Sequence, residues 1–146
     1  MPFIFRSLLL LMIFASFSAK GQVDSVYESL KNLKGIKKVE PLLNEAHKML
    51  LNNPSRSSEY IREVIDILSR IENDSLKGEA YSLSGKAQYY TANYDSALND
   101  WKYALETFQK IKYDKGIAEQ YNNLGVWYYS AASDYDAALN YHLLSI

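Results

Sequence analysis

From Val23 onward, apolar residues recur at the three- and four-residue spacing of amphipathic helices. Two such sets have the same internal spacing, and each member of the second lies 40 residues after its counterpart in the first. The sets are Ile61, Val64, Ile65, Leu68 and Ile71, and then Trp101, Ala104, Leu105, Phe108 and Ile111. The pattern predicts an all-α chain built on an internal repeat of about 40 residues.

Further residues follow the same repeat. Tyr81, Gly85 and Tyr89 recur 40 residues later as Tyr121, Gly125 and Tyr129. A turn and a similar helix opening then follow in each copy, and we expect Asn93 and Asp134 to cap these helices. We expect Pro41 and Pro54 to lie near helix starts, Lys77-Gly78 and Lys115-Gly116 to break the chain between helical pairs, and Asn73-Asp74-Ser75 to form a cap rather than a glycosylation site.

Small and large residues alternate in a way that favours close helix packing. Gly85 and Gly125 leave room on the first helix of each pair, and Ala97 and Ala138 leave room on the second. A larger residue at such a site would overpack the contact. Large rings should fill the space between the helices, and those rings are Tyr81, Trp101, Tyr121 and Tyr141. Because one pair cannot bury both of its faces, the pairs are expected to stack.

The N-terminus has a different character. Arg6 precedes an apolar run of 12 residues, Ser7–Ser18, which is shorter than the roughly 20 residues of a membrane-spanning helix. Small residues follow at Ala19 and Gly21. The segment predicts a signal peptide over residues 1–21, cleaved between Gly21 and Gln22, with an uncleaved anchor as the less favoured alternative. We therefore expect an exported, periplasmic protein without a membrane span in its mature part.

Composition narrows the function classes. The chain has 16 Lys and Arg against 17 Asp and Glu, which argues against a nucleic-acid surface. The absence of cysteine excludes a disulfide scaffold, a thiolate zinc site and a cysteine nucleophile. His47 and His142 are the only histidines, and both are expected to be packed or solvated helix residues. No catalytic constellation or glycine-rich phosphate loop is present, so we expect no catalytic residue, cofactor or metal.

Several of these residues resemble the tetratricopeptide repeat (TPR) family. They are Leu124-Gly125 with Tyr128, then Asp134-Tyr135-Asp136-x-Ala138-Leu139, and in the preceding copy Gly85, Tyr94-Asp95-x-Ala97-Leu98 and Trp101. The resemblance implies a right-handed α-solenoid of antiparallel helix pairs, with a period longer than the usual value of about 34 residues. We expect a lead-in helix over 22–35, a degenerate pair over 36–74, a TPR over 75–113 and a truncated TPR over 114–146.

The resemblance also implies a binding surface on the concave face, on the first helix of each pair. Its residues would be Glu79, Ser82, Lys86, Tyr89 and Tyr90, followed by Glu119, Asn122, Val126 and Tyr129. Asparagine can bond a peptide backbone in both senses, and tyrosine offers rigid area with a polar tip. For Tyr89 and Tyr129, burial in the helix packing is an equal alternative. Lys86 is nearly alone beside two glutamates, which argues against capture of a C-terminal carboxylate.

Two function hypotheses follow from the resemblance. The first is an exported TPR interaction module without catalysis, which binds a peptide or protein on its concave face. The second is the extracytoplasmic sensor region of a bacterial signalling protein, a histidine kinase or a helix-turn-helix regulator. A small hydrolase is disfavoured because no nucleophile has its base. At the C-terminal edge the apolar residues Leu139, Leu143, Leu144 and Ile146 lack a neighbour, so we expect a partner, a longer array or self-association there.

Overall fold

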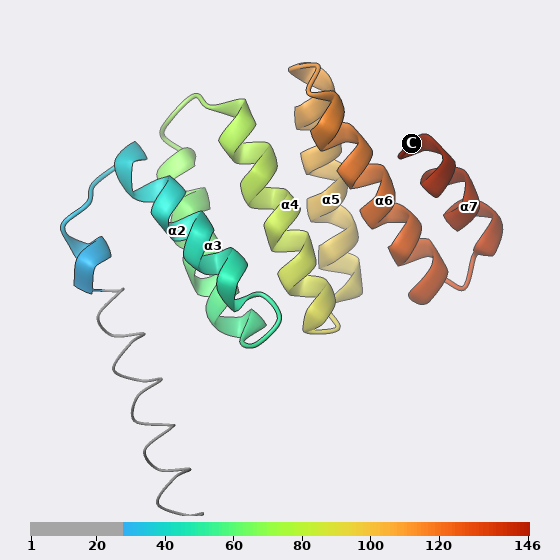
Figure 1. Ribbon diagram of the computed structural model, residues 1–146, viewed down its shortest axis with the longest axis horizontal. Helices are drawn as coiled ribbons and strands as arrows, with labels where there is room; N and C mark the ends of the chain where they lie inside the picture. Colours follow the sequence, from blue (N-terminus) through green and yellow to red (C-terminus); the bar gives the residue numbers. More distant parts are fainter. Residues whose placement is uncertain (1–27) are drawn as a thin grey trace, which may run out of the picture. The chain divides into compact units, whose positions relative to one another are not determined.

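The computed structural model describes residues 28–146, which contain helices and no β-strand. The unit Gly35–Ile146 consists of consecutive antiparallel helices joined by short turns (Figure 1). They are α2 (Ile36–Met49), α3 (Pro54–Leu68), α4 (Asp74–Tyr90), α5 (Tyr94–Lys110), α6 (Asp114–Ser130) and α7 (Tyr135–Leu144). The all-α prediction is confirmed for the described residues.

The described part of the N-terminal unit is short. Residues 28–31 form a helical turn, after which the amide of Leu33 donates to the carbonyl of Leu30 at 3.1 Å. The predicted signal peptide, its cleavage point between Gly21 and Gln22, and residues 22–27 of the lead-in helix lie outside the described residues. In the part of the chain that the structure describes, no helix is both long and apolar enough to cross a membrane.

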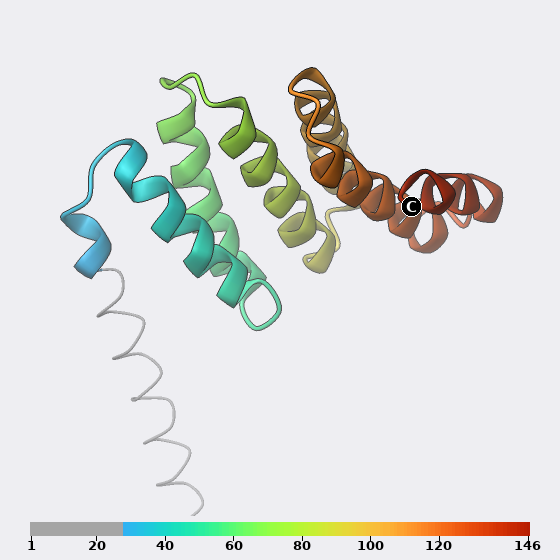
Figure 2. The same ribbon diagram turned by 45° about the horizontal axis from the view of Figure 1, so that its top comes forward.

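The helices form two rows (Figures 1 and 2). Each helix packs against the next one in the sequence, and α4 also touches α2 and α6. Among the described helices α3, α5 and α7, by contrast, no two are in contact. We call α2, α4 and α6 the inner row and α3, α5 and α7 the outer row. Side chains on the inner row of neighbouring pairs therefore lie close enough to form one surface.

Side-chain caps define three helix starts. Asn53, Asn73 and Asp134 each accept a hydrogen bond from the backbone amide three residues further on, at 3.0 to 3.1 Å. Such caps satisfy amides that have no partner within the helix. The caps expected at Asn73 and Asp134 are confirmed, and Pro54 is the first residue of α3.

Three local predictions were wrong. The Asn93 side chain does not cap α5 but donates its amide hydrogens to Gln88 Oε1 and Thr91 Oγ1, which closes the preceding turn. Pro41 lies inside α2, in its second turn, and not near the helix start. Lys77-Gly78 and Lys115-Gly116 lie inside α4 and α6 instead of between helical pairs. The two glycines were misassigned because a glycine that ends a helix and one that packs under a ring look alike in a sequence.

Gly85 lies directly beneath the indole of Trp101. A Cβ atom at Gly85 would stand 2.4 Å from Trp101 Nε1, and the indole is fixed there because Nε1 donates to the carbonyl of Ser82 at 3.1 Å. In the next pair a Cβ atom at Gly125 would stand 2.7 Å from Cε1 of His142. We call each such contact, a ring resting on a glycine of the neighbouring helix, a glycine seat. The packing role expected for Gly85, Gly125 and His142 is therefore confirmed.

A third glycine seat joins two helical pairs. The ring of Phe108 lies between the inner-row helices α4 and α6, where Cβ atoms at Gly78 and Gly116 would stand 2.5 Å and 2.7 Å from it. Phe108 is only 4% exposed, and the Tyr113 ring stacks edge-on against it with 5.4 Å between centroids. One ring therefore requires a missing side chain on both neighbouring helices.

The buried core runs along the contact between the two rows. Ala97, Trp101 and Leu124 form one buried cluster, against which Leu98, Leu105, Trp127 and other partly buried residues pack. In the first pair the corresponding contact is aliphatic, and its fully buried members are Val39, Leu42, Leu43, Ile61, Val64 and Leu68. The first pair therefore lacks the large ring that the later pairs place at this contact.

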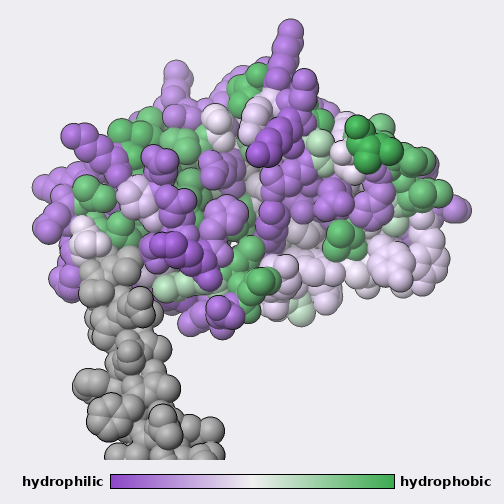
Figure 3. Space-filling model, viewed as in Figure 1, coloured by the Kyte–Doolittle hydropathy of each residue, from purple (hydrophilic) through white to green (hydrophobic). Residues whose placement is uncertain are grey.

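The outward face of α7 is apolar and uncovered. Leu139, Leu143 and Leu144 are 57% to 59% exposed, and Figure 3 shows hydrophobic side chains gathered at this end of the unit. The repeat offset of 41 residues matches Leu139 with Leu98, which is partly buried against the core cluster. The exposure expected at this edge is thus present in the described chain.

Asp100 on α5 carries a carboxylate in a partly buried position. Ser84 Oγ donates to Asp100 Oδ2 at 2.6 Å, across the contact between α4 and α5. Burial raises the pKa of Asp100, and the hydrogen bond from Ser84 opposes that rise only in part. The folded protein therefore holds the Asp100 proton more tightly than the unfolded chain does.

We expect Gly85→Ala to lower the free energy of unfolding by about 1–3 kcal/mol, since the added methyl group must displace the Trp101 indole. This loss is net of the higher helix propensity of alanine. Urea unfolding followed by tryptophan fluorescence measures it. In a Trp101→Leu background, where the rigid ring is gone, the same Gly85→Ala change should cost much less. Equal costs in both backgrounds would mean that no glycine seat exists.

We expect Asp100→Asn to raise the melting temperature at pH 7. Because the pKa of Asp100 is raised in the folded state, its contribution to stability is present at low pH and is lost as the pH rises through the folded-state pKa. The advantage of Asp100→Asn should therefore shrink below about pH 4, where the carboxyl is protonated in both states. Thermal melts from pH 3 to pH 8 test this, with the exposed Glu106→Gln on the same helix as control. A pH-independent difference contradicts the assignment.

Candidate functional site

Two stripes of side chains share the outward face of the inner row. On α4 the stripe is Ser75, Glu79, Ser82 and Lys86, and on α6 it is Lys115, Glu119, Asn122 and Val126. In both helices the steps are four, three and four residues, which keep the side chains on one helix face. The two stripes lie next to each other because α4 and α6 are in contact.

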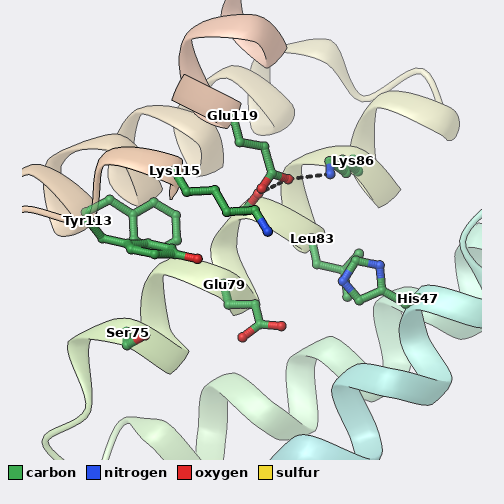
Figure 4. Close-up of a pocket in the computed structure, with 10 residues that line it drawn as sticks. His47, Ser75, Glu79, Leu83, Lys86, Tyr113, Lys115 and Glu119 are labelled. Carbon is green, nitrogen blue, oxygen red and sulfur yellow. Dashed lines mark hydrogen bonds and ion pairs between the residues drawn. The ribbon is translucent and has the colours of Figure 1, made fainter. Parts of the chain in front are cut away.

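A cavity of about 240 Å³ opens along this face. Side chains from α2, α4, α5 and α6 line it, together with the residue that precedes α6 (Figure 4). The lining comprises His47, Ser75, Glu79, Ser82, Leu83, Lys86, Phe108, Tyr113, Lys115 and Glu119. The floor is partly apolar, and the rim is charged.

An ion pair spans the cavity wall from α4 to α6. Lys86 Nζ lies 2.6 Å from Glu119 Oε1, and the two side chains are 27% and 43% exposed. Ser82 Oγ also donates to Glu119 Oε1, at 3.4 Å. A pair this exposed contributes about 1 kcal/mol or less to stability, so its main effect is to fix both side chains in one geometry.

Behind the cavity wall, a hydrogen-bonded chain of buried polar groups joins α4 to α6. The fully buried Gln120 donates through Nε2 to Ser82 Oγ at 3.0 Å. Asn123 Nδ2 in turn donates to Gln120 Oε1 at 3.2 Å. Ser82 is itself only 5% exposed, so it contributes to the cavity chiefly by holding Gln120 and Glu119.

The tyrosines of the proposed surface differ in exposure. Tyr89 is half-buried, its ring lies 5.8 Å from that of Trp101, and its hydroxyl is 2.8 Å from Ser130 Oγ. Tyr90 is 51% exposed and Tyr129 is 61% exposed. Tyr89 therefore belongs to the packing between α4 and its neighbours, whereas Tyr90 and Tyr129 present their rings to solvent.

Four of the nine sequence-predicted surface residues meet in the cavity, namely Glu79, Ser82, Lys86 and Glu119. The other five do not line it. Asn122 is exposed and Val126 is half-buried on α6, while Tyr89, Tyr90 and Tyr129 lie at the other end of the inner-row helices. The structure thus separates the expected surface into a charged cavity and a tyrosine-rich end.

Sequence reasoning missed several lining residues, and two of them had a usable signal. Lys115 was overlooked because Lys115-Gly116 was taken as a break, yet it precedes Glu119 by four residues as Ser75 precedes Glu79. His47 follows the small residue Ala46 as Lys86 follows Gly85. For Leu83, Phe108 and Tyr113 no repeat position marks a surface role, since their place in the wall depends on the packing of three helices.

The site has no evident catalytic or metal chemistry. Among residues 28–146, no group of three or more histidine, aspartate or glutamate side chains is arranged to hold a metal ion. The cavity contains hydroxyl, carboxylate, ammonium and imidazole groups, which suit recognition of a polar ligand by hydrogen bonds and ion pairs. Comparison of the chain with protein-family models, curated proteins and solved structures gave no match.

We expect Gln120→Ala to lower the free energy of unfolding by about 1–3 kcal/mol, because it leaves Ser82 Oγ and Asn123 Nδ2 buried without their shared partner. Asn122→Ala is the control, since Asn122 is exposed two positions away on the same helix and should change stability by less than about 0.5 kcal/mol. Urea midpoints compare the two variants. Similar small effects would show that the buried chain adds nothing to the contact between α4 and α6.

Proposed function

We propose that the chain is an exported TPR protein without catalysis that binds a peptide or protein partner on the face of its inner row. The observation that carries this proposal is the meeting of His47, Lys86 and Glu119, from three successive inner-row helices, around one cavity. A surface assembled from several helices suits an extended or helical peptide, which touches each helix in turn.

The physical setting of the cavity supports binding rather than structural packing alone. Its charged rim remains open to solvent, while glycine seats and a buried hydrogen-bonded chain hold the helices behind it. A site on rigid elements loses little conformational freedom when a ligand binds. Tyr90 adds an exposed aromatic ring at the C-terminal end of α4, of the kind that anchors protein interfaces.

The family part of the proposal depends on residue pattern and packing together. The repeat of about 40 residues coincides with helical pairs, and its glycines lie under rings of the partner helix. Export to the periplasm rests on the charged start, short apolar run and small residues of the N-terminal sequence.

We expect Tyr90→Ala and Asn122→Ala to weaken binding of a partner captured from the exported fraction, each by up to about tenfold. The matched controls are Tyr103→Ala and Asn99→Ala, which remove the same exposed side-chain types from the outer row. The partner is identified by mass spectrometry, purified, and titrated against all four variants. Equal losses in inner-row and outer-row variants would refute binding on the inner row.

A further inference from the structure

The cavity contains two positive and two negative side chains, and only one pair of them is matched. Lys86 and Glu119 neutralise each other at 2.6 Å. Among the described residues, no ion pair involves Glu79 or Lys115. One carboxylate and one ammonium group therefore face the cavity without a protein counter-charge.

These two groups reach the cavity from different helices. Figure 4 shows Glu79 extending from α4 and Lys115 extending from α6, with both charged ends directed into the same space and the Tyr113 hydroxyl beside them. They are long side chains, yet they form no ion pair with each other in the described structure. A ligand that supplies the opposite charge to each would therefore gain two charge-assisted hydrogen bonds.

The size and walls of the cavity limit what can enter. Its volume of about 240 Å³ is below the range of about 300–1,000 Å³ that is usual for drug-sized ligands. Leu83 and Phe108 give an apolar wall along which the methylene stem of a lysine or arginine can lie. The balanced formal charge of the four ionised side chains disfavours a polyanion. These properties fit one or two side chains of a longer chain.

We propose that this cavity selects a peptide segment that carries both charges close together, with its lysine or arginine on Glu79 and its aspartate or glutamate on Lys115. The inference rests on the proposed peptide-binding function and specifies its ligand. The Lys86–Glu119 pair forms a preset wall, while Glu79 and Lys115 determine which charge is accepted at each end.

Backbone-amide NMR titration of the purified chain tests this with capped pentapeptides. The mixed probes are Ala-Lys-Ala-Glu-Ala and Ala-Glu-Ala-Lys-Ala, and the reference probes replace both charged residues by two lysines, two glutamates or two glutamines. We expect the better mixed probe to bind about tenfold more tightly than the glutamine probe, with shifts centred on residues that line the cavity. An equimolar mixture of free lysine and free glutamate should bind far more weakly, which distinguishes a peptide segment from a small zwitterion.

Charge reversal provides the decisive comparison. Glu79→Lys should shift the preference to the two-glutamate probe, and Lys115→Glu should shift it to the two-lysine probe, because each variant leaves the cavity with like charges. Glu106→Lys and Lys102→Glu make the same charge changes on exposed outer-row positions and should preserve the preference for the mixed probe. An inverted preference cannot arise from misfolding, which would only abolish binding.

The outcomes separate this inference from the function on which it rests. If mixed and neutral probes bind alike, or if reversal at Glu79 and Lys115 leaves the preference unchanged, the charge-selective cavity is wrong. Peptide binding that is weakened by Tyr90→Ala would in that case still support the proposed function. If none of the probes binds and the inner-row variants leave partner capture unchanged, the proposed function itself is wrong.

Discussion

The structure depends on helices that approach each other more closely than ordinary side chains permit. Where a glycine replaces a side chain, a ring of the neighbouring helix rests on the backbone, as Trp101 does on Gly85 and His142 does on Gly125. The gain is the burial of a large ring with its polar atom satisfied, since the Trp101 indole donates to the carbonyl of Ser82. These contacts determine the spacing of the rows, and every polar feature of the inner row follows from that spacing.

The candidate site is a consequence of this spacing. Only at the distance set between α4 and α6 can Gln120 bond Ser82 and Lys86 reach Glu119. The buried chain of amides and hydroxyls also fixes the relative register of the two helices, because a shift of one residue would leave buried polar groups without partners. The apolar packing thus positions a polar surface, and the polar network in turn restricts how the apolar helices can slide.

Much of the fold could be predicted from the sequence because periodicity and turn residues act locally. The helical spacing, the caps at Asn73 and Asp134, and the packing role of Gly85 were all visible in the pattern. Gly78 and Gly116 were misassigned, since their role is set by Phe108 on another helix. The cavity was only partly foreseen for the same reason. Repeat position locates a residue on a face, but it does not indicate which neighbours enclose a space.

Phe108 has a consequence for how the array loses its structure. The ring belongs to the pair α4–α5, yet it also rests on α6 of the following pair. Detaching α6 therefore exposes the side chain of a residue that otherwise remains folded, so part of the penalty for opening one pair falls on its neighbour. In a linear array each such shared ring acts as a coupling between adjacent units. The middle and last pairs are accordingly linked in a cooperative melting transition instead of fraying independently.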